Sequence, residues 1–405
     1  MSEGKMRVAI IGAGPSGVDA ALACRERGWE VDVYERAPRA AAAIRDWGHV
    51  RMFTPWEMNR SARMDEALAG AGVAIPDGGA PPTGAEYAQQ LIDPLLDTPA
   101  LDGVVHLGCE VLEIARAGLS KEQEIATDAR AARPFRLILR QDGAERAAVA
   151  DAVIDATGTE FAAGPLGDGG VAAPGERSLA ARIRRRSPDL PAESTSFAGR
   201  TTLVAGTGHS AQTAIAGLAD VVAASPGTRV VWVSRSADPD WGSPVDDPRP
   251  DRAALAARAG EFASGAVGGI EFLGGLSVHG LALAGAGIDV QLDGTPGFRT
   301  VRVDEVVSLT GSRADTSLYR QLQVHECYAT GAPIKLSAQL LGDAAGDCLS
   351  QPEHGPELLR HREPGFFSIG AKSYGRAPNY LMRTGFGQAE GVVALLARDL
   401  AAVGA

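Results

Sequence analysis

Two stretches of the chain show the same succession of apolar, glycine and small residues. Residues 7–11, RVAII, are a largely β-branched run that leads into GAGPSG and then into the small-residue segment VDAALA. The same succession returns at 201–218, where TTLVA leads into GTGHSA and QTAIAGL. A continuous apolar run is typical of a central parallel strand that is buried on both faces. The pattern therefore predicts two strand–turn–helix units, almost two hundred residues apart.

The first glycine turn has the spacing of a dinucleotide-binding site. Gly12 permits a tight turn, Gly14 lets a pyrophosphate approach the backbone, and Gly17 lets the helix pack closely on the sheet. The helix N-terminus that follows offers free N–H groups to phosphates. The next predicted strand, WEVDVYER, ends in Glu35, an acid that can accept hydrogen bonds from a ribose 2′-OH. The candidate residues here are Gly12, Ala13, Gly14, Pro15, Ser16, Gly17, Glu35 and Arg36.

The second glycine turn differs from the first at its third position and at the end of its second strand. Ala211 replaces the third glycine and is tolerated there. The second strand, TRVVWVSRS, ends without an acid, and Arg235 is counted to the position of Glu35. A guanidinium suits a 2′-phosphate, which favours NADPH over NADH, although an ordinary exposed arginine is the alternative. The candidates are Gly206, Thr207, Gly208, His209, Ser210, Ala211, Ser234 and Arg235.

The repeat extends beyond the glycines. The segments ADAVIDATG (150–158) and VDEVVSLTG (303–311) align, and each follows a predicted hairpin with a Gly-containing turn. Each half therefore reads as a glycine-turn βαβ unit, a hairpin, and a strand that ends in Thr-Gly. Two copies predict two dinucleotides, one held as a cofactor and one that delivers electrons to it. The candidates added by these strands are Ala156, Thr157, Gly158, Thr310 and Gly311.

The two copies also predict the domain organisation. We expect an α/β protein with two Rossmann-like three-layer dinucleotide-binding domains, one inserted in the other, because a length of 405 residues suits two to three domains. The segment after Gly158 is rich in Gly and Pro and is predicted to be a linker. The expected parts are 1–160 (first domain), 161–194 (linker), 195–310 (inserted domain) and 311–405 (completion of the first domain).

Composition removes several classes of partner. The formal net charge of −11 argues against nucleic acid or an anionic membrane as the main partner. The sequence has no apolar run long enough for a membrane span, and its start does not resemble a signal peptide. The cysteines Cys24, Cys109, Cys327 and Cys348 lie far apart, without C-x-x-C or metal-ligand spacing. We therefore expect a cytoplasmic protein with no metal site.

These motifs give the chain a resemblance to a known group. On GAGPSG, Glu35, DATGT and GTGHSA it resembles, over essentially its whole length, the two-dinucleotide-binding-domain flavoproteins. This group includes flavin-containing monooxygenases and thioredoxin reductase-like enzymes. The resemblance implies FAD in the first domain and NADPH in the inserted one. The segment CEVLEI resembles the strand whose backbone contacts the FAD adenine, which implies a role for Val111.

A narrower resemblance links the chain to a bacterial flavoprotein-monooxygenase-like subgroup of mostly uncertain substrate. It rests on WGHVRMFTPWEMN, PPTGAEYAQQLIDPLL and EPGFFSIGAKSYGRAPNYLMRTGFGQ. Two family features are missing. The strand FFSIG is followed by Ala371 instead of an acid near the ribityl chain, and the linker fingerprint F-x-G-x-x-x-H is absent between 158 and 200. The second departure weakens the case for a true monooxygenase.

Several polar residues are candidates for the flavin and the substrate. RTGFGQ predicts a Gly-rich turn that opens a helix, whose N-terminus would stabilise negative charge on a reduced flavin; a simple helix start is the alternative. The cysteine in GDCLSQPEHG is a candidate thiolate, and a plain thiol is its alternative. The catalytic candidates are His49, Arg51, Cys348, Lys372 and Tyr374. The further cofactor candidates are Gly370, Arg376, Gly387 and Gln388. For each, a structural role is the alternative.

The resemblance implies an FAD-containing, NADPH-using oxidoreductase. The first hypothesis is monooxygenation, in which a flavin C4a-hydroperoxide transfers oxygen from O₂ to a soft N, S or As atom of a small molecule. The second is an NADPH-dependent flavin reductase or a thiol/disulfide oxidoreductase without C-x-x-C. The third is a redox-sensing flavoprotein. The sequence leaves the oligomeric state open, a homodimer included.

Overall fold

The chain forms two compact units, and the second is inserted in the first. Unit 1 comprises Met1–Ala162 and Arg313–Ala405, and unit 2 comprises Ala163–Ser312. The computed structural model describes residues 5–159, 163–242, 249–295, 297–342, 354–377 and 380–404. The sequence-based boundary at 310 lies close to the observed end of the inserted unit.

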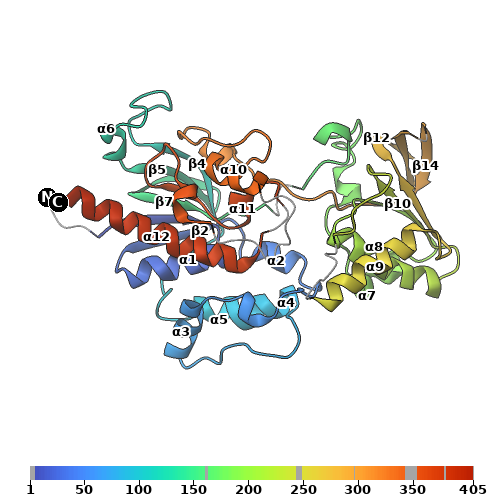
Figure 1. The fold of residues 1–405 in the computed structure, drawn as a ribbon, viewed down its shortest axis with the longest axis horizontal. Coiled ribbons are helices and arrows are strands. Elements are labelled where there is room, and N and C mark those ends of the chain that lie inside the picture. Colours follow the sequence, from blue (N-terminus) through green and yellow to red (C-terminus); the bar gives the residue numbers. More distant parts are fainter. Residues whose placement is uncertain are drawn as a thin grey trace. The chain divides into compact units, whose positions relative to one another are not determined.

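Unit 1 is built on a five-stranded parallel sheet of order β16-β7-β1-β2-β3 (Figure 1). β1 lies at its centre, as its unbroken apolar sequence predicts, with Ile11 paired to both Tyr34 and Asp155. This register brings the carboxyl ends of β1, β2 and β7 together at one edge. The fifth strand comes from the C-terminal segment. The strands are β1 (Arg7–Ile11), β2 (Glu30–Glu35), β3 (Val105–Leu107), β7 (Ala152–Asp155) and β16 (Phe366–Ser368).

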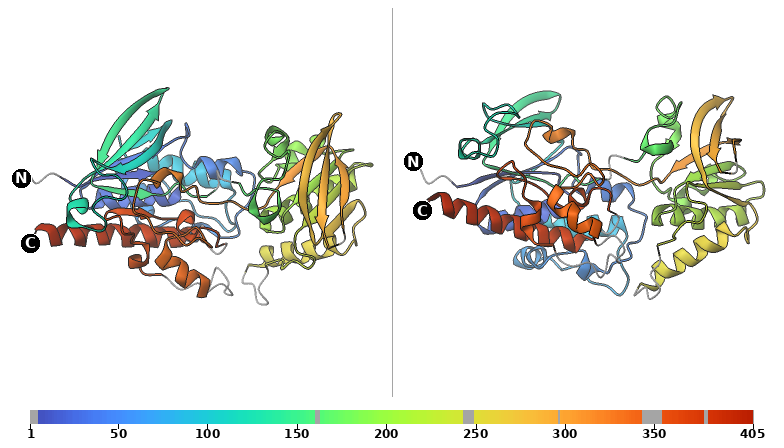
Figure 2. Two further views of the ribbon diagram at one scale, coloured as in Figure 1. Left: turned by 90° about the horizontal axis from the view of Figure 1, so that it is seen from above. Right: turned by 45° about the horizontal axis from the view of Figure 1, so that its top comes forward.

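Both faces of this sheet are covered. Val8 and Ile10 of β1 belong to a core made with the helices, and α12 lies alongside α1 (Figures 1 and 2). Ala9 and Ile11 belong to a second core made with a three-stranded antiparallel sheet. The antiparallel strands are β4 (Cys109–Arg116), β5 (Phe135–Gln141) and β6 (Ala144–Ala150). The helices of unit 1 are α1 (Pro15–Glu26), α2 (Ala42–Asp46), α3 (Ala62–Gly70), α4 (Gly84–Tyr87), α5 (Asp93–Leu96), α6 (Asp128–Ala131), α10 (Ile334–Gly342), α11 (Ala371–Tyr374) and α12 (Met382–Gly404).

A buried carboxylate attaches α3 to α1. Asp19 of α1 is fully buried and accepts hydrogen bonds from the Ser61 hydroxyl and, at 2.8 Å, from the Arg63 guanidinium. Burial raises the pKa of Asp19 to about 6 even though Arg63 and Ser61 act in the opposite direction. The folded protein therefore binds a proton at Asp19 more tightly than the unfolded chain, whose aspartates titrate near pH 4.

The raised pKa of Asp19 predicts the direction in which the stability of the protein changes with pH. The contribution of Asp19 to the free energy of unfolding increases as pH falls through 6 toward 4. Compared with Asp19→Asn, the unchanged protein should gain roughly 1.4 kcal/mol between pH 7 and pH 5. Urea unfolding of both proteins at the two pH values measures this. Glu66→Gln, at an exposed position of α3, is the control. If the unchanged protein gained as much stability relative to Glu66→Gln as relative to Asp19→Asn, the prediction would be contradicted.

Unit 2 repeats this architecture. Its five-stranded parallel sheet has the order β11-β10-β9-β15-β8, and a three-stranded antiparallel sheet β12-β13-β14 accompanies it. Both sheets match those of unit 1 strand by strand. The parallel strands are β8 (Ile183–Arg184), β9 (Thr201–Ala205), β10 (Arg229–Ser234), β11 (Ile270–Gly274) and β15 (Glu305–Ser308). The remaining elements are β12 (Leu276–Ala284), β13 (Gly287–Gly294), β14 (Arg299–Val303), α7 (Leu190–Glu193), α8 (His209–Ala224) and α9 (Pro250–Ala263).

The segment expected to be a linker, 161–194, belongs largely to unit 2. It supplies the edge strand β8, which pairs in parallel with β15. It is held by Glu176, whose buried carboxylate accepts hydrogen bonds from the backbone N–H groups of Leu166 and Ala173 and from Arg185 at 2.7 Å. The Gly and Pro content indicated irregular backbone, and these hydrogen bonds connect distant parts of that backbone to one another.

Candidate functional site

The first glycine turn has the geometry of a phosphate cradle. Gly12 has a φ of +98°, and a Cβ there would lie 2.8 Å from the carbonyl oxygen of Ala156. A Cβ at Gly17 would lie 1.9 Å from the carbonyl oxygen of Gly12, so neither position accepts a side chain. Gly14 faces open space, and no acid lies in the first turn of α1. The backbone is thus accessible to an anion at the helix N-terminus.

Glu35 connects this turn to the end of β2. Its side chain is buried, and its two oxygens accept hydrogen bonds from the backbone N–H groups of Ala13 and Ala37, each at 2.9 Å. A carboxylate oxygen has two lone pairs, so both oxygens keep acceptor capacity. Glu35 also lines the adjacent cavity, where that capacity suits ribose hydroxyls.

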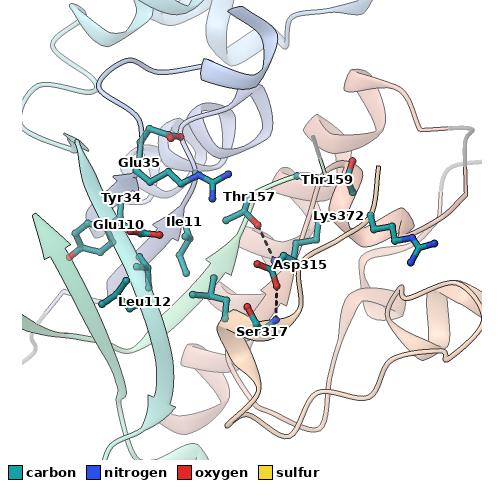
Figure 3. Close-up of a pocket in the computed structure, with 16 residues that line it drawn as sticks. Ile11, Tyr34, Glu35, Glu110, Leu112, Thr157, Thr159, Asp315, Ser317 and Lys372 are labelled. Atoms are coloured by element: carbon teal, nitrogen blue, oxygen red, sulfur yellow. Dashed lines mark hydrogen bonds between the residues drawn. The ribbon is translucent and has the colours of Figure 1, made fainter. Parts of the chain in front are cut away.

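A cavity of about 220 Å³ lies at the carboxyl ends of β1, β2 and β7 (Figure 3). Its wall is completed by β4 and by the segment with which the chain returns to unit 1. The structure brings together here seven predicted residues from distant parts of the sequence: Gly12, Glu35, Arg36, Val111, Thr157, Gly158 and Lys372. Sequence reasoning missed other lining residues, among them Glu110, Thr159, Arg313, Asp315 and Ser317.

One of the lining residues, Lys372, belongs to a buried ion pair. Lys372 donates to Asp155 at 2.6 Å. It also donates to the hydroxyl of Thr157 at 2.9 Å (Figure 3). Asp155 also accepts from the backbone N–H and the hydroxyl of Thr157. Both charged side chains are almost completely buried. Asp155 was not predicted, although it stands two residues before the Thr-Gly pair in the DATG motif.

The structure places the remaining C-terminal candidates away from the cavity. α12 begins at Met382, so Gly387 and Gln388 lie in its second turn and not at its N-terminus, as was expected. Gln388 accepts from the backbone N–H of Gly370 and donates to Ser373, both at 2.8 Å. Its amide is thus engaged in packing α11 against α12.

Gly370, Tyr374 and Arg376 also lie outside the cavity lining. A Cβ at Gly370, whose φ is +70°, would lie 2.9 Å from the Ser16 hydroxyl, so the glycine permits close packing. Tyr374 is buried and packs edge-on against Tyr380. The hydroxyl of Tyr380 lies 3.0 Å from the hydroxyl of Ser16. Arg376 is exposed.

The N-terminal catalytic candidates do not line the cavity either. Arg51 is exposed, donates to the carbonyl of Pro81 at 2.5 Å and lies 3.7 Å from Glu86. His49 is half-buried in the turn that follows α2. Cys348 lies outside the described residues. The other cysteines, Cys24, Cys109 and Cys327, are buried free thiols.

The second glycine turn repeats the first. Gly206 has a φ of +121°, and a Cβ there would lie 2.2 Å from the carbonyl oxygen of Leu309. Gly208 faces open space, and Ala211 is fully buried at the close-packing position. The equivalent backbone and carboxylate bonds recur as well: Asp151 accepts from the Arg7 N–H at 2.9 Å, and Asp304 accepts from the Thr201 N–H at 2.8 Å.

The rest of the second site surrounds this turn. Thr207 accepts from Gln212, whose amide also donates to Trp241. Thr310 donates to the carbonyl of Gly164 at 2.8 Å, and Gly311 has a φ of +84°. His209 and Ser210 begin α8. All these residues lie in unit 2.

Strand register corrects one sequence-based alignment. Gly12 donates to the carbonyl of Tyr34, and Gly206 donates to that of Val233, so these two acceptors are equivalent. The position of Glu35 is therefore taken by Ser234, and Arg235 corresponds to Arg36. The alignment by the apolar run had matched Arg235 to Glu35, one residue before its true counterpart Arg36. Ser234 is buried and Arg235 is exposed, so the strand end offers a hydroxyl followed by a cation.

Two kinds of structural feature are missing from the described part of the chain. Within it, no helix combines the length and the apolar character needed to cross a membrane. The same residues contain no group of three or more His, Cys, Asp or Glu side chains placed to hold a metal ion.

Comparison with known proteins agrees with this architecture. Residues 10–60 match the NAD(P)-binding Rossmann-like domain family, and no curated protein matches the chain. The bacillithiol disulfide reductase of Bacillus cereus has a similar structure, with a TM-score of 0.68, 18% identity, and coverage of 98% of this chain and 99% of that chain.

Two enzymes of other activities are similar in structure as well. The ornithine N-hydroxylase of Kutzneria sp. 744, in a complex with reduced FAD, NADP⁺ and L-ornithine, gives a TM-score of 0.62 at 15% identity, covering 98% and 99% of the two chains. The thioredoxin reductase of Lactococcus lactis gives 0.60 at 16% identity, covering 97% and 98%. The predicted fold, that of the two-dinucleotide-binding-domain flavoproteins, is confirmed.

Proposed function

We propose that the chain is an FAD-containing oxidoreductase that takes its electrons from NADPH. The observation that carries this proposal is the doubled glycine cradle with unlike strand ends. Unit 1 presents the carboxylate of Glu35 beside its cradle, which suits the free ribose hydroxyls of FAD. Unit 2 presents Ser234 and Arg235 at the equivalent positions, which suits the 2′-phosphate of NADPH.

The residues of unit 1 fit the cofactor in a definite arrangement. The turn from Gly12 to Gly17 would hold the diphosphate on backbone N–H groups, because side chains are excluded there. Glu35 would accept from the ribose, and the backbone at Val111 would contact the adenine at the β4 wall of the cavity. When bound, FAD supplies hydride acceptance from NADPH and transfer of the two electrons to a second substrate.

Oxygen transfer is the first assignment for that second substrate. NADPH would supply two electrons. One atom of O₂ would form a bond to a soft N, S or As atom of a small molecule, and the other would combine with two protons and leave as water. The narrower sequence resemblance and the likeness to an N-hydroxylating enzyme support this assignment. The absence of C-x-x-C from the sequence also supports it, because a vicinal pair is the simplest dithiol relay.

Disulfide reduction is the second assignment, favoured by the structural likeness to a bacillithiol disulfide reductase. Here NADPH and one proton would convert a disulfide into two thiols. Cys327 is the described thiol with the most suitable surroundings: hydrogen bonds from the backbone N–H and the hydroxyl of Thr330 lower its pKa. Turnover of a disulfide that is lost in Cys327→Ser or Cys348→Ser would support this assignment.

Anaerobic stopped-flow spectroscopy tests the proposal. NADPH should bleach a bound flavin, at least about tenfold faster than NADH, before oxygenated buffer is added. A transient absorbing species that is neither oxidised nor reduced flavin, together with an oxygenated product, supports oxygen transfer. Direct reoxidation coupled to disulfide loss supports the reductase. FAD binding with no turnover on any acceptor would indicate redox sensing, and failure to bind FAD would refute the proposal.

Arg235 should determine much of the coenzyme preference. A guanidinium–phosphate contact contributes about 1.5–3 kcal/mol, so Arg235→Ala should weaken NADPH binding roughly tenfold to hundredfold and leave NADH binding unchanged. Titration of the flavin-loaded protein with each nucleotide measures both constants. Arg229→Ala, which removes an exposed arginine at the amino end of the same strand, is the control. Equal weakening of NADH binding would contradict the assignment.

A further inference from the structure

Lys372 has more donor capacity than its neighbours in the described part of the chain use. An ammonium carries three N–H donors. Two are taken up, by Asp155 at 2.6 Å and by the Thr157 hydroxyl at 2.9 Å. The side chain is only 2% exposed, so water has little access to the third. The ring of Tyr319 lies 5.0 Å from Nζ, a cation–π distance that adds attraction without providing an oxygen or nitrogen acceptor.

The remaining donor belongs to a residue that lines the cavity. Lys372 shares this lining with Gly12, whose turn is the expected diphosphate cradle, and with Glu35, the expected ribose partner. Buried donors in native proteins are almost always paired. The remaining donor therefore predicts a hydrogen-bond acceptor supplied by the ligand, next to the Thr157–Gly158 turn.

The cavity lining carries equal numbers of cations and acids, so the burial of each charge decides where an anion would bind. The three cations are Arg36, Arg313 and Lys372, and the three acids are Glu35, Glu110 and Asp315. Asp315 is exposed and the buried Glu35 already accepts from two backbone N–H groups, whereas Lys372 is a buried cation, and charge–charge interactions are strongest where water is excluded. A phosphate entering this space would therefore interact most strongly with Lys372.

From this geometry, and resting on the proposed function, we propose that Lys372 is a cofactor-binding residue that donates a charge-assisted hydrogen bond to the diphosphate of FAD. This replaces the sequence-based assignment of Lys372 to catalysis. Asp155 then pairs with the ammonium when no ligand is bound and competes with the phosphate for it. Lys372 acts on the phosphate group and not on the nucleoside, which separates this role from a purely structural one.

The alternative is that the ion pair only fixes the Thr157–Gly158 turn. The two roles predict opposite effects for the two partners. Asp155→Asn keeps Lys372 and an oxygen for the Thr157 N–H but removes the competing anion, so ADP and FAD should bind at least as tightly as before. Lys372→Met should weaken both ligands about tenfold to hundredfold. If the pair is only structural, both substitutions should weaken binding.

The experiment measures the binding of ADP, adenosine and FAD to the full chain freed of flavin, by calorimetry at pH 6, far below the ordinary pKa of lysine. Lys372→Met leaves Asp155 buried without a counter-ion, so the charge-neutral double variant Lys372→Met/Asp155→Asn provides a second form that is expected to fold. Lys335→Met, at an exposed position of α10, is the matched control. Thermal unfolding with and without ADP gives an independent readout of the same coupling.

Loss of affinity for ADP and FAD in both Lys372 variants, with adenosine binding unchanged and no loss in Asp155→Asn, is the expected result. Equal losses for ADP and adenosine, or a loss in Asp155→Asn, would overturn the phosphate contact and leave the proposed function standing. Unchanged ADP binding in the Lys372 variants would do the same. Absence of FAD binding by the unchanged chain would overturn both proposals.

Discussion

Replacing Glu363 by glutamine is expected to lower the free energy of unfolding by about 3–5 kcal/mol. Glu363 is 1% exposed and accepts hydrogen bonds from Arg116 at 2.7 Å and Arg130 at 2.8 Å, and from the backbone N–H of Gln323. Both arginines are also buried. Glutamine keeps the volume but removes the charge, so two guanidinium groups would remain in the core without a counter-ion.

Glu357→Gln is the matched control for this experiment. Glu357 pairs with Arg360 and Arg398, but its side chain is 51% exposed. Exposed ion pairs contribute about 0–1 kcal/mol, so the change in unfolding free energy should stay in that range. Chemical unfolding of both variants at pH 7 gives the comparison. Similar losses in the two would mean that the buried triad contributes no more than a surface pair.

The pH dependence of the same group follows from its surroundings. Burial alone would raise the pKa of Glu363, but hydrogen bonds from Arg130 and Arg116 outweigh it and the pKa is lowered. The folded state therefore holds the proton less tightly than the unfolded chain. The contribution of Glu363 to stability is present above pH of about 4.5 and is lost as pH falls further. In Glu363→Gln this loss in acid should be smaller.

Gly206→Ala is expected to slow the reduction of the flavin by NADPH strongly while FAD stays bound. The new Cβ would lie 2.2 Å from the carbonyl oxygen of Leu309, at a φ of +121°. Backbone strain and overpacking each cost about 1–3 kcal/mol. The turn must move to relieve them, and we expect the rate of flavin reduction by NADPH to fall at least about hundredfold. Dithionite, which needs no nucleotide site, should still reduce the flavin.

Gly208→Ala separates binding from stability in the same turn. A Cβ at Gly208 meets no atom within 4 Å, and its backbone angles of φ −69° and ψ 173° suit alanine. The free energy of unfolding should therefore change by less than about 1 kcal/mol. The methyl group would still occupy the space through which a pyrophosphate approaches the backbone. Unchanged NADPH affinity in this variant would mean that the diphosphate lies elsewhere.

The parts of the molecule that the sequence predicted are those with local requirements. Gly12 and Gly206 need positive φ and leave no room for a side chain, so the same residue type recurs at both turns. Asp151 aligns with Asp304 because each carboxylate accepts a hydrogen bond from the backbone N–H at the start of the neighbouring strand. Such constraints act within a few residues and are visible as spacing.

The parts that the sequence did not predict depend on pairing between distant segments. Lys372 meets Asp155 because β16 pairs with β7, across 217 positions of the chain. The shift from Arg235 to Ser234 is a matter of strand register, which the apolar pattern fixes only to within a residue or two. β8 is two residues long, too short for any periodicity to appear.

The order of the strands along the chain sets an order of synthesis. All five parallel strands of unit 2 lie between residues 183 and 308, so a ribosome delivers that sheet in one piece. The sheet of unit 1 begins at residue 7 but lacks its edge strand β16 until residue 368. α12, which covers α1, emerges later still. The inserted unit can thus finish folding on the nascent chain, while the apolar face of α1 stays uncovered until the last helix has been synthesised.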